Sequence, residues 1–287
     1  MFDLKEAQKN DNGVIIGLDV GGSNTKIIGF HKAKLLLETQ VQASDPMASA
    51  YGAVGKFLSI NNLSLDDVTS INTTGVGASY LSGSFFNCDT RKAPEFDSVG
   101  LGGLYTAGVQ RAVVVSIGTG TSIVFANGSS IQHVIGSGVG GGTIVGLSRV
   151  MLGMRDISSI CQMAEDGELR KIDLAVGDLS RTELPGLSMD VTASNFGKVD
   201  DLASQEDLAL GILNLVFQSI GTASVLVSRL VKTDEIVFTG NLLRMAKGRE
   251  ILARFSDLYN VKIIVPDHAE FATAIGAALY GAKLAHS

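Results

Sequence analysis

Glycine-rich turns at the ends of buried strands constrain this chain more than any other feature. Residues 113–147 read VVVSIGTGTSIVFANGSSIQHVIGSGVGGGTIVGL. The pattern predicts a buried strand at 113–117, a Gly-Thr turn at 118–121, a second strand at 122–126 and a helix that a glycine run opens near Thr143. Backbone N–H groups converge at such turns because no Cβ intervenes, and a helix N-terminus adds partial positive charge. The stretch therefore indicates a site for an anion, most simply the phosphates of a nucleotide.

A second glycine turn lies near the start of the chain. Residues 13–20 (GVIIGLDV) predict a buried strand, and a second strand follows at 27–31. Strand–turn–strand is a hairpin, unlike the strand–loop–helix of Walker and Rossmann sites. We expect Asp19 to hold a hydrated Mg²⁺ and the turn to face phosphate oxygens. The residues expected at the phosphates are Gly21, Gly22, Ser23, Asn24, Thr25 and Lys26. The structural alternative, a Gly-Gly hairpin with a solvated lysine, stays open.

The remaining chain alternates strand and helix patterns, which predicts the α/β class. Glycine turns at strand ends recur at Gly21, Gly118 and Gly240. We expect two similar lobes, each with a mixed β-sheet flanked by helices, around a nucleotide cleft. The first lobe is placed at 13–110 and the second at 111–287. Strands are predicted at 34–42, 69–75, 235–241 and 261–265, and helices at 46–58, 151–165, 168–177, 205–231, from 242 onward and at 270–285, with an ordered loop at 185–197.

Composition and charge narrow the class of protein. The chain has 287 residues, of which 45% are hydrophobic and 18% charged, enough for two well-filled cores. Its net charge of −6 argues against nucleic acid as a partner. Two cysteines suit a reducing cytosol, the polar start does not resemble a signal peptide, and we expect no membrane-spanning segment. A soluble, cytoplasmic protein is expected.

Two acidic residues begin a predicted helix. Glu95 and Asp97 precede a segment rich in Gly and Leu. Carboxylates there commonly act only as caps and helix-dipole partners, worth less than about 1 kcal/mol. A carboxylate at the edge of a cleft can also serve as a general base toward a substrate hydroxyl. Charge alone does not choose between these functions.

The longest helical pattern, at 205–231, is apolar on more than one face. It is acidic at its start and basic at its end, as the helix dipole prefers. Such a helix is either a central core element or a contact between subunits.

Several motifs together resemble the type II, eukaryotic-like pantothenate kinases of the acetate kinase, sugar kinase, heat-shock chaperone and actin superfamily. They are DVGGSNTK at 19–26, EFD at 95–97, SIGTGTS at 116–122, GGGTIVGL at 140–147, DVTASNFG at 190–197 and AIGA at 274–277. The resemblance extends over nearly the whole chain after the first dozen residues. The two phosphate turns identify only the superfamily, whereas the other motifs, in this order, are specific to the branch.

The resemblance implies ATP- and Mg²⁺-dependent phosphorylation of the 4′-hydroxyl of pantothenate, the first step towards coenzyme A, in a homodimer with the actin-like duplicated fold. By that resemblance Glu95 is the general base, residues 19–26 form the first phosphate loop, and Ile157 lies against the adenine. The further ATP contacts that it implies are Thr119, Gly141, Gly142, Thr143, Ile144, Val145 and, at the adenosine end, Asn241.

One residue departs from the family pattern. The family carries a basic residue, usually Arg, shortly before the glycine run, whereas this chain has His133 there. Histidine is shorter and offers at most two donors. Either His133 does a weaker version of the task, a basic residue from elsewhere replaces it, or the substrate is not pantothenate. A histidine that only caps a strand end is the structural alternative.

Two other functions are compatible with these residues. One is a related kinase of the same superfamily that acts on a sugar-like substrate. The other is a nucleotide-binding regulator with weakened catalysis, for which the missing Arg is the motive. A catalyst would release ADP when given pantothenate and Mg-ATP, whereas a regulator would bind ATP and release none.

Overall fold

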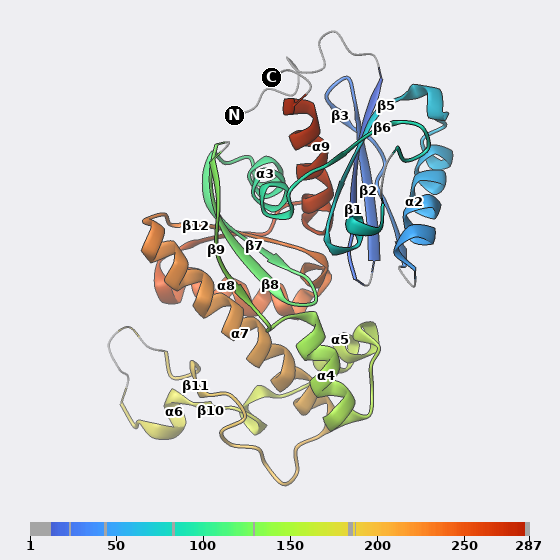
Figure 1. Cartoon of the computed structure of the whole chain (residues 1–287). Helices are drawn as coiled ribbons and strands as arrows, with labels where there is room; N and C mark the ends of the chain where they lie inside the picture. Colours follow the sequence, from blue (N-terminus) through green and yellow to red (C-terminus); the bar gives the residue numbers. More distant parts are fainter. Residues whose placement is uncertain are drawn as a thin grey trace.

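The computed structural model describes residues 13–22, 24–42, 45–81, 84–128, 130–182, 186 and 188–284. Most strands lie in two mixed sheets of similar topology (Figure 1). The first sheet has the order β3-β2-β1-β5-β6, with β4 also on β2, and contains β1 (Val14–Val20), β2 (Asn24–His31), β3 (Lys34–Leu35), β4 (Thr39–Gln42), β5 (Val68–Thr74) and β6 (Asp89–Lys92). The second has the order β13-β12-β7-β8-β9 and contains β7 (Arg111–Ile117), β8 (Thr121–Asn127), β9 (Ser130–Ser137), β12 (Glu235–Thr239) and β13 (Lys262–Ile264).

The two sheets repeat one pattern of strand directions. In each, a first strand pairs antiparallel with the next strand in the chain and parallel with a strand that returns after helices: β1 with β2 and β5, and β7 with β8 and β12. A hairpin at the centre of each sheet therefore ends in a tight turn at equivalent edges. This duplication confirms the predicted α/β fold with two mixed sheets.

Helices separate and cover the sheets. Figure 1 shows α3 and α9 between the two sheets, α2 on the outer side of the first and α7 with α8 beyond the second. The helices are α2 (Pro46–Ile60), α3 (Glu95–Ala107), α4 (Gly141–Leu152), α5 (Ile157–Glu165), α6 (Val176–Leu179), α7 (Gln205–Val231), α8 (Ala246–Tyr259) and α9 (Ala272–Leu284). Short 3₁₀ turns lie at η1 (Leu65–Asp67), η2 (Val76–Tyr80), η3 (Leu169–Lys171), η4 (Asn241–Arg244) and η5 (Ala269–Phe271), and β10 (Leu174–Ala175) pairs with β11 (Thr192–Ser194).

Helices α3 and α9 touch through their backbones. A Cβ placed on Gly102 would lie 1.7 Å from the carbonyl oxygen of Ala272, and one on Gly276 would lie 1.8 Å from that of Ser98. Only glycine permits this approach, because any side chain would force the helices apart. The contact joins the helix that follows the first sheet to the helix that follows the second.

Helix α9 also completes the first sheet. Its Ile275 and Ala278 pack in one cluster with Ile15 and Ile28 of that sheet. The predicted boundary at residue 110 assigns α9 to the second lobe. One face of the first sheet is therefore covered by a helix that lies outside residues 13–110. The division at that residue stays a proposal.

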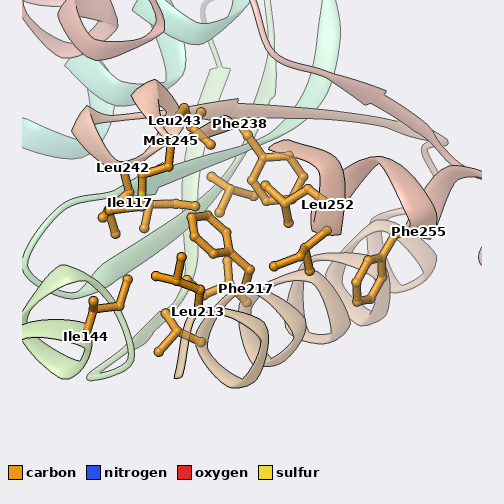
Figure 2. Close-up of a cluster of buried hydrophobic side chains, with 14 of the residues drawn as sticks. Ile117, Ile144, Leu213, Phe217, Phe238, Leu242, Leu243, Met245, Leu252 and Phe255 are labelled. Carbon is orange, nitrogen blue, oxygen red and sulfur yellow. The ribbon is translucent and has the colours of Figure 1, made fainter. Parts of the chain in front are cut away.

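Helix α7 lies in the core of the second half. Its Leu213 and Phe217 pack with Phe238 of β12 and Leu252 of α8 (Figure 2). By length and composition alone this helix could cross a membrane, but 61% of its most apolar window is buried within the protein, as in the core helix of a globular protein. Near its end, Leu226 and Leu230 remain 61% and 72% exposed. The core alternative is thus confirmed for most of the helix.

The helix predicted at 151–165 is interrupted. Gly153, at φ +70°, ends α4, and Asp156 caps the separate helix α5 by accepting a hydrogen bond of 2.8 Å from the N–H of Ser159. A glycine in the αL conformation ends a helix, and an Asp N-cap begins the next one. The apolar pattern continues across 151–165, and the prediction therefore joined the two helices into one.

The prediction of a helix at 168–177 is wrong. The chain there forms η3, the short strand β10 and the single turn α6. The cause is Asp173, a buried carboxylate that accepts hydrogen bonds from the N–H of Phe196 at 2.9 Å and from the Nδ2 of Asn214 at 2.7 Å. These long-range bonds hold the chain against the loop predicted at 185–197, of which residues 185 and 187 lie outside the described part. The strand predicted at 34–42 is divided into β3 and β4.

The α3–α9 contact yields a test of stability. We expect Gly276→Ala to lower the free energy of unfolding by about 2 kcal/mol or more, because its Cβ would overlap backbone atoms that cannot move independently. Gly52→Ala is the matched control: it lies on an exposed part of α2 with nothing within 4 Å of the new Cβ, and should raise that free energy by about 0.5–1 kcal/mol. Urea denaturation measures both. Equal stabilities for Gly276→Ala and the unmodified protein would contradict the close packing.

Candidate functional site

A cleft of about 1390 Å³ is lined by residues of both halves. Its walls include the turns that follow β1, β7 and β12, which are the three strands predicted to end in glycine turns. Residues of the first half at the cleft are Asp19, Gly21, Gly22, Asn24, Lys26, Gly75, Val76, Glu95 and Val99. From the second half, the residues that were also expected at the nucleotide are Thr119, Gly141, Gly142, Val145, Ile157 and Asn241. The sequence-based sites of the two halves thus meet in one cavity.

The turn after β7 is braced by the start of α4. The N–H groups of Gly141 and Gly142 donate to the carbonyl oxygens of Gly118 and Thr119, each at 2.9 Å. These N–H groups were expected at the phosphates, but they already have partners within the protein. They hold the turn in shape, and the helix dipole of α4 still points at the cleft.

Two of the residues implied beside the ATP do not line the cleft. The hydroxyl of Thr143 accepts from the N–H of Gly140 and donates to the carbonyl of Gly138, both at 3.1 Å, so it caps α4. The side chain of Ile144 is fully buried in the hydrophobic cluster of the second half (Figure 2). Both side chains make contacts within the protein at the start of α4 and are not among the residues that line the cleft.

The first turn presents alternate residues. Asn24 and Lys26 line the cleft, whereas Thr25 is fully buried and its hydroxyl accepts a hydrogen bond from that of Ser49 on α2. The expectation that Thr25 and Lys26 both face the phosphates is corrected: β2 begins at Asn24, and consecutive side chains of a strand point to opposite faces. Ser23 lies outside the described residues.

Asp19 is the electrostatic centre of the site. Burial raises the pKa of this carboxyl group, and the negative charge of Glu95 raises it further, while the positive charge of Lys26 lowers it. Lys26 lies directly opposite Asp19 in the β1–β2 register. Gly75, at φ +88°, packs so closely that a Cβ would lie 2.6 Å from Oδ1 of Asp19. A carboxylate held in this way is stabilised by any cation that enters beside it.

A magnesium ion fits this place. Thr74 lies directly opposite Asp19 in the β1–β5 register, is 1% exposed, and its hydroxyl has no hydrogen-bond partner in the described structure. An orphaned buried hydroxyl beside a carboxylate suits a hydrated ion, since Mg²⁺ keeps several waters and needs few protein ligands. The described residues contain no cluster of three or more His, Cys, Asp or Glu that could hold a metal by themselves. The remaining ligands of the ion would be water and phosphate oxygens.

Apolar side chains form part of the cleft wall. Ile157 lies there with Cys161, Leu242 and Met245, and burial raises the pKa of the Cys161 thiol to about 11, so the thiol is neutral. Asn241 also lines the cleft, and its Oδ1 is buried without a hydrogen-bond partner in the described structure. An apolar slot with one unpaired acceptor fits a nucleobase or ribose that donates a hydrogen bond.

Several lining residues were missed from the sequence. Arg244 lies three residues after Asn241 on η4, and Cys161 lies one helical turn after Ile157 on α5. Their spacing from the residues already singled out was the available signal. Among the described residues, the cationic side chains that line the cleft are Lys26 and Arg244.

His133 does not line the cleft. Its ring stacks on that of Phe96, with the ring centres 3.9 Å apart and an angle of 17° between the planes. Phe96 follows Glu95 in the first turn of α3. The ring of His133 is thus placed against the residue that follows Glu95, the expected base, and outside the lining of the cleft.

Comparisons with known proteins place the chain in a family. A family model described as Fumble matches residues 104–280. The chain is 27% identical over 272 residues to a type II pantothenate kinase of Staphylococcus saprophyticus, covering 91% of this chain and 98% of that protein. It is 29% identical over 280 residues to a type II pantothenate kinase of Oceanobacillus iheyensis, covering 92% and 98%.

Solved structures share the fold. The activator of the 2-hydroxyisocaproyl-CoA dehydratase of Clostridium difficile, with bound ADPNP, superposes with a TM-score of 0.68 at 17% identity, covering 95% of this chain and 97% of that one. A ROK family glucokinase of Streptomyces griseus, in complex with glucose and AMPPNP, gives 0.59 at 10% identity, covering 93% and 98%. These likenesses confirm the predicted actin-like duplicated fold.

Because the pKa of Asp19 is raised, we expect that replacing this carboxyl group by a neutral one stabilises the folded protein, by an amount that depends on pH. Because the folded state holds this proton more tightly than the unfolded chain, the free energy of unfolding falls as pH rises through the interval between the unfolded and the folded pKa. We expect the ligand-free Asp19→Asn variant to be more stable than the unmodified protein at pH 7. The gain should vanish below about pH 4, where the carboxyl group is protonated in both states.

Denaturant titrations over a pH series measure this gain. Asp201→Asn, at an exposed position, is the control and should show no such pH-dependent gain. A destabilised Asp19→Asn protein at pH 7 would show that the carboxylate is stabilised by its present neighbours.

Proposed function

Because the chain belongs to the Fumble family, the type II pantothenate kinases, we propose that it transfers the γ-phosphoryl group of ATP to the 4′-hydroxyl of pantothenate, the first step of coenzyme A biosynthesis. One observation carries the proposal: Asp19 and Glu95 of the first half and the turn at 118–121 of the second half line the same cleft. A phosphoryl donor held at one wall and an acceptor at the other would meet there.

Glu95 is the proposed general base. It begins α3, lies exposed on the cleft, and is close enough to Asp19 for its charge to affect that group's pKa. A primary alcohol is a weak nucleophile, so a carboxylate that accepts its proton during transfer lowers the barrier. The proton passes from the 4′-hydroxyl to the carboxylate of Glu95 as the oxygen bonds to phosphorus and ADP leaves.

Other residues of the cleft hold the phosphates. Lys26 supplies positive charge opposite Asp19, and the dipole of α4 adds to it behind the turn at 118–121. Asp19 with Thr74 would hold the hydrated Mg²⁺, which neutralises phosphate charge when bound. Arg244 also lines the cleft and is a candidate for the basic residue from elsewhere that replaces the family's Arg.

A cytoplasmic homodimer is part of the proposal. The relatives named type II pantothenate kinase match over nearly their whole length, and the exposed Leu226 and Leu230 of α7 are candidates for the subunit contact. The net charge of −6 supports a small-molecule substrate rather than nucleic acid.

A nucleotide-binding regulator is the second candidate. The observation that favours it is the place of His133, which stacks on Phe96 instead of lining the cleft. An assay with the purified protein, Mg-ATP and a panel of primary alcohols that includes pantothenate and hexoses separates the functions. ADP release together with phosphorylated pantothenate by mass spectrometry supports the proposal. Activity on another alcohol alone reassigns the substrate, and ATP binding without ADP release supports a regulator.

Removing the proposed base tests its role. We expect Glu95→Gln to bind ATP nearly as the unmodified protein does and to lower kcat by ~10²-fold or more, because the amide keeps the size of the side chain but cannot accept the proton. Asp97→Asn is the matched control, since Asp97 lies in the same first turn of α3 but does not line the cleft, and its kcat should change little. Steady-state kinetics with isothermal titration of ATP measure both. An unchanged kcat for Glu95→Gln would end the assignment.

A further inference from the structure

The contact between His133 and Phe96 joins a strand of the second sheet to the helix that carries Glu95. The rings are nearly parallel, 17° apart, with centres separated by 3.9 Å. The partner of the histidine is therefore an aromatic face of the protein. A ring stacked at this distance restricts the rotation of the Phe96 side chain.

Strand β9 is shaped to make this contact. The β8–β9 register shifts between Ile123 and Val124, which leaves Val134 as an extra residue on β9. Such bulges redirect the side chains beside them, often near active sites. Ile131, two residues before His133, packs over Gly100, which lies one helical turn after Phe96. Residues two apart on a strand and four apart on a helix lie on the same face of their element. The contacts His133–Phe96 and Ile131–Gly100 are therefore successive contacts of the same two faces.

The backbone at the start of α3 is held by the N–H of Ala93, which donates to the carbonyl of Thr73, and by Ser98, which donates to the carbonyl of Pro94, but the first turn has no capping side chain. Its N-cap position is Pro94, which provides no side-chain cap. Glu95 and Phe96 are both exposed in this first turn. The first turn of a helix without a capping side chain leaves N–H groups without helical partners and frays readily. The ring of His133 supplies a constraint at that place.

We propose that His133 is a positioning residue, whose ring holds Phe96 and thereby keeps the carboxylate of Glu95 directed into the cleft. The inference rests on the proposed function, since it assigns importance to the place of Glu95. It accounts for the departure from the family's basic residue: at this position the chain uses the flat face of a ring, and cationic contact with phosphate is left to Lys26 and Arg244.

Three variants separate stacking from chemistry. His133→Phe keeps a flat ring but has no proton, charge or hydrogen bond, whereas His133→Ala loses the ring. Gln132→Ala is the control, because Gln132 is exposed and adjacent on β9, where the alternation of a strand turns it away from α3. We expect His133→Ala to lower kcat on pantothenate by about tenfold or more with an unchanged KM for ATP, since misplacement of a catalytic group costs turnover and not nucleotide binding.

His133→Phe should keep kcat within about twofold of the unmodified value. Its kcat should also vary with pH as that of the unmodified protein does from about pH 6 to about pH 9, whereas the loss of a histidine that acted by its own titration would remove one limb of the pH profile. Phe96→Ala should match His133→Ala, and the double variant should be no worse than either. The proposal is overturned if His133→Phe is as impaired as His133→Ala, if its pH profile loses a limb, or if His133→Ala turns over normally.

Hydrogen exchange tests the contact without any activity. We expect amides of the first turn of α3 to exchange faster in His133→Ala than in the unmodified protein, and at the unmodified rate in His133→Phe and Gln132→Ala. Equal exchange in all four proteins would overturn the positioning role. Inactivity of the unmodified protein on pantothenate would instead refute the proposed substrate, and the exchange result would stand apart from it.

Discussion

The backbone contact between α3 and α9 is the constraint on which the rest of the structure depends. Gly102 and Gly276 let the two helices approach until a single added carbon would overlap the opposite chain. Each helix also lies close on a sheet: a Cβ on Gly17 of β1 would meet the carbonyl oxygen of Ala274, and one on Gly103 would meet Val114 of β7. The glycines therefore set the spacing of the two sheets, and with it the width of the cleft where their hairpin turns end.

That spacing brings together groups that repel one another. Asp19 is partly buried near Glu95, and Lys26 offsets only part of the cost, since the pKa of Asp19 remains raised. A site of this kind is unfavourable while empty and favourable once a cation enters, which is the electrostatic preparation that transfer of a phosphoryl group requires. The protein accordingly gives up some stability at the place where it would gain binding.

Much of this architecture could be predicted from the sequence because it depends on local signals. Helix α7 has the predicted bounds, since its capping residues and apolar pattern agree, and the three glycine turns do meet at one cleft. Long-range effects could not be predicted. The hydrogen bonds to Asp173 hold a short strand where a helix was predicted. Side chains alternate along β2, so that Thr25 is buried on the face away from the cleft. His133 contacts Phe96 next to a bulge in β9, and no spacing in the sequence predicts this contact.

We propose that one cleft between the duplicated halves holds the phosphoryl donor and acceptor in line. A crystal structure of the protein with Mg-ADPNP and pantothenate measures this directly. We expect the triphosphate between the turn at 118–121 and the turn after β1, a metal ion beside Asp19, and the 4′-hydroxyl within hydrogen-bond distance of Glu95, about 3 Å. A nucleotide bound outside this cleft, or an acceptor hydroxyl far from both the γ-phosphate and Glu95, would contradict it.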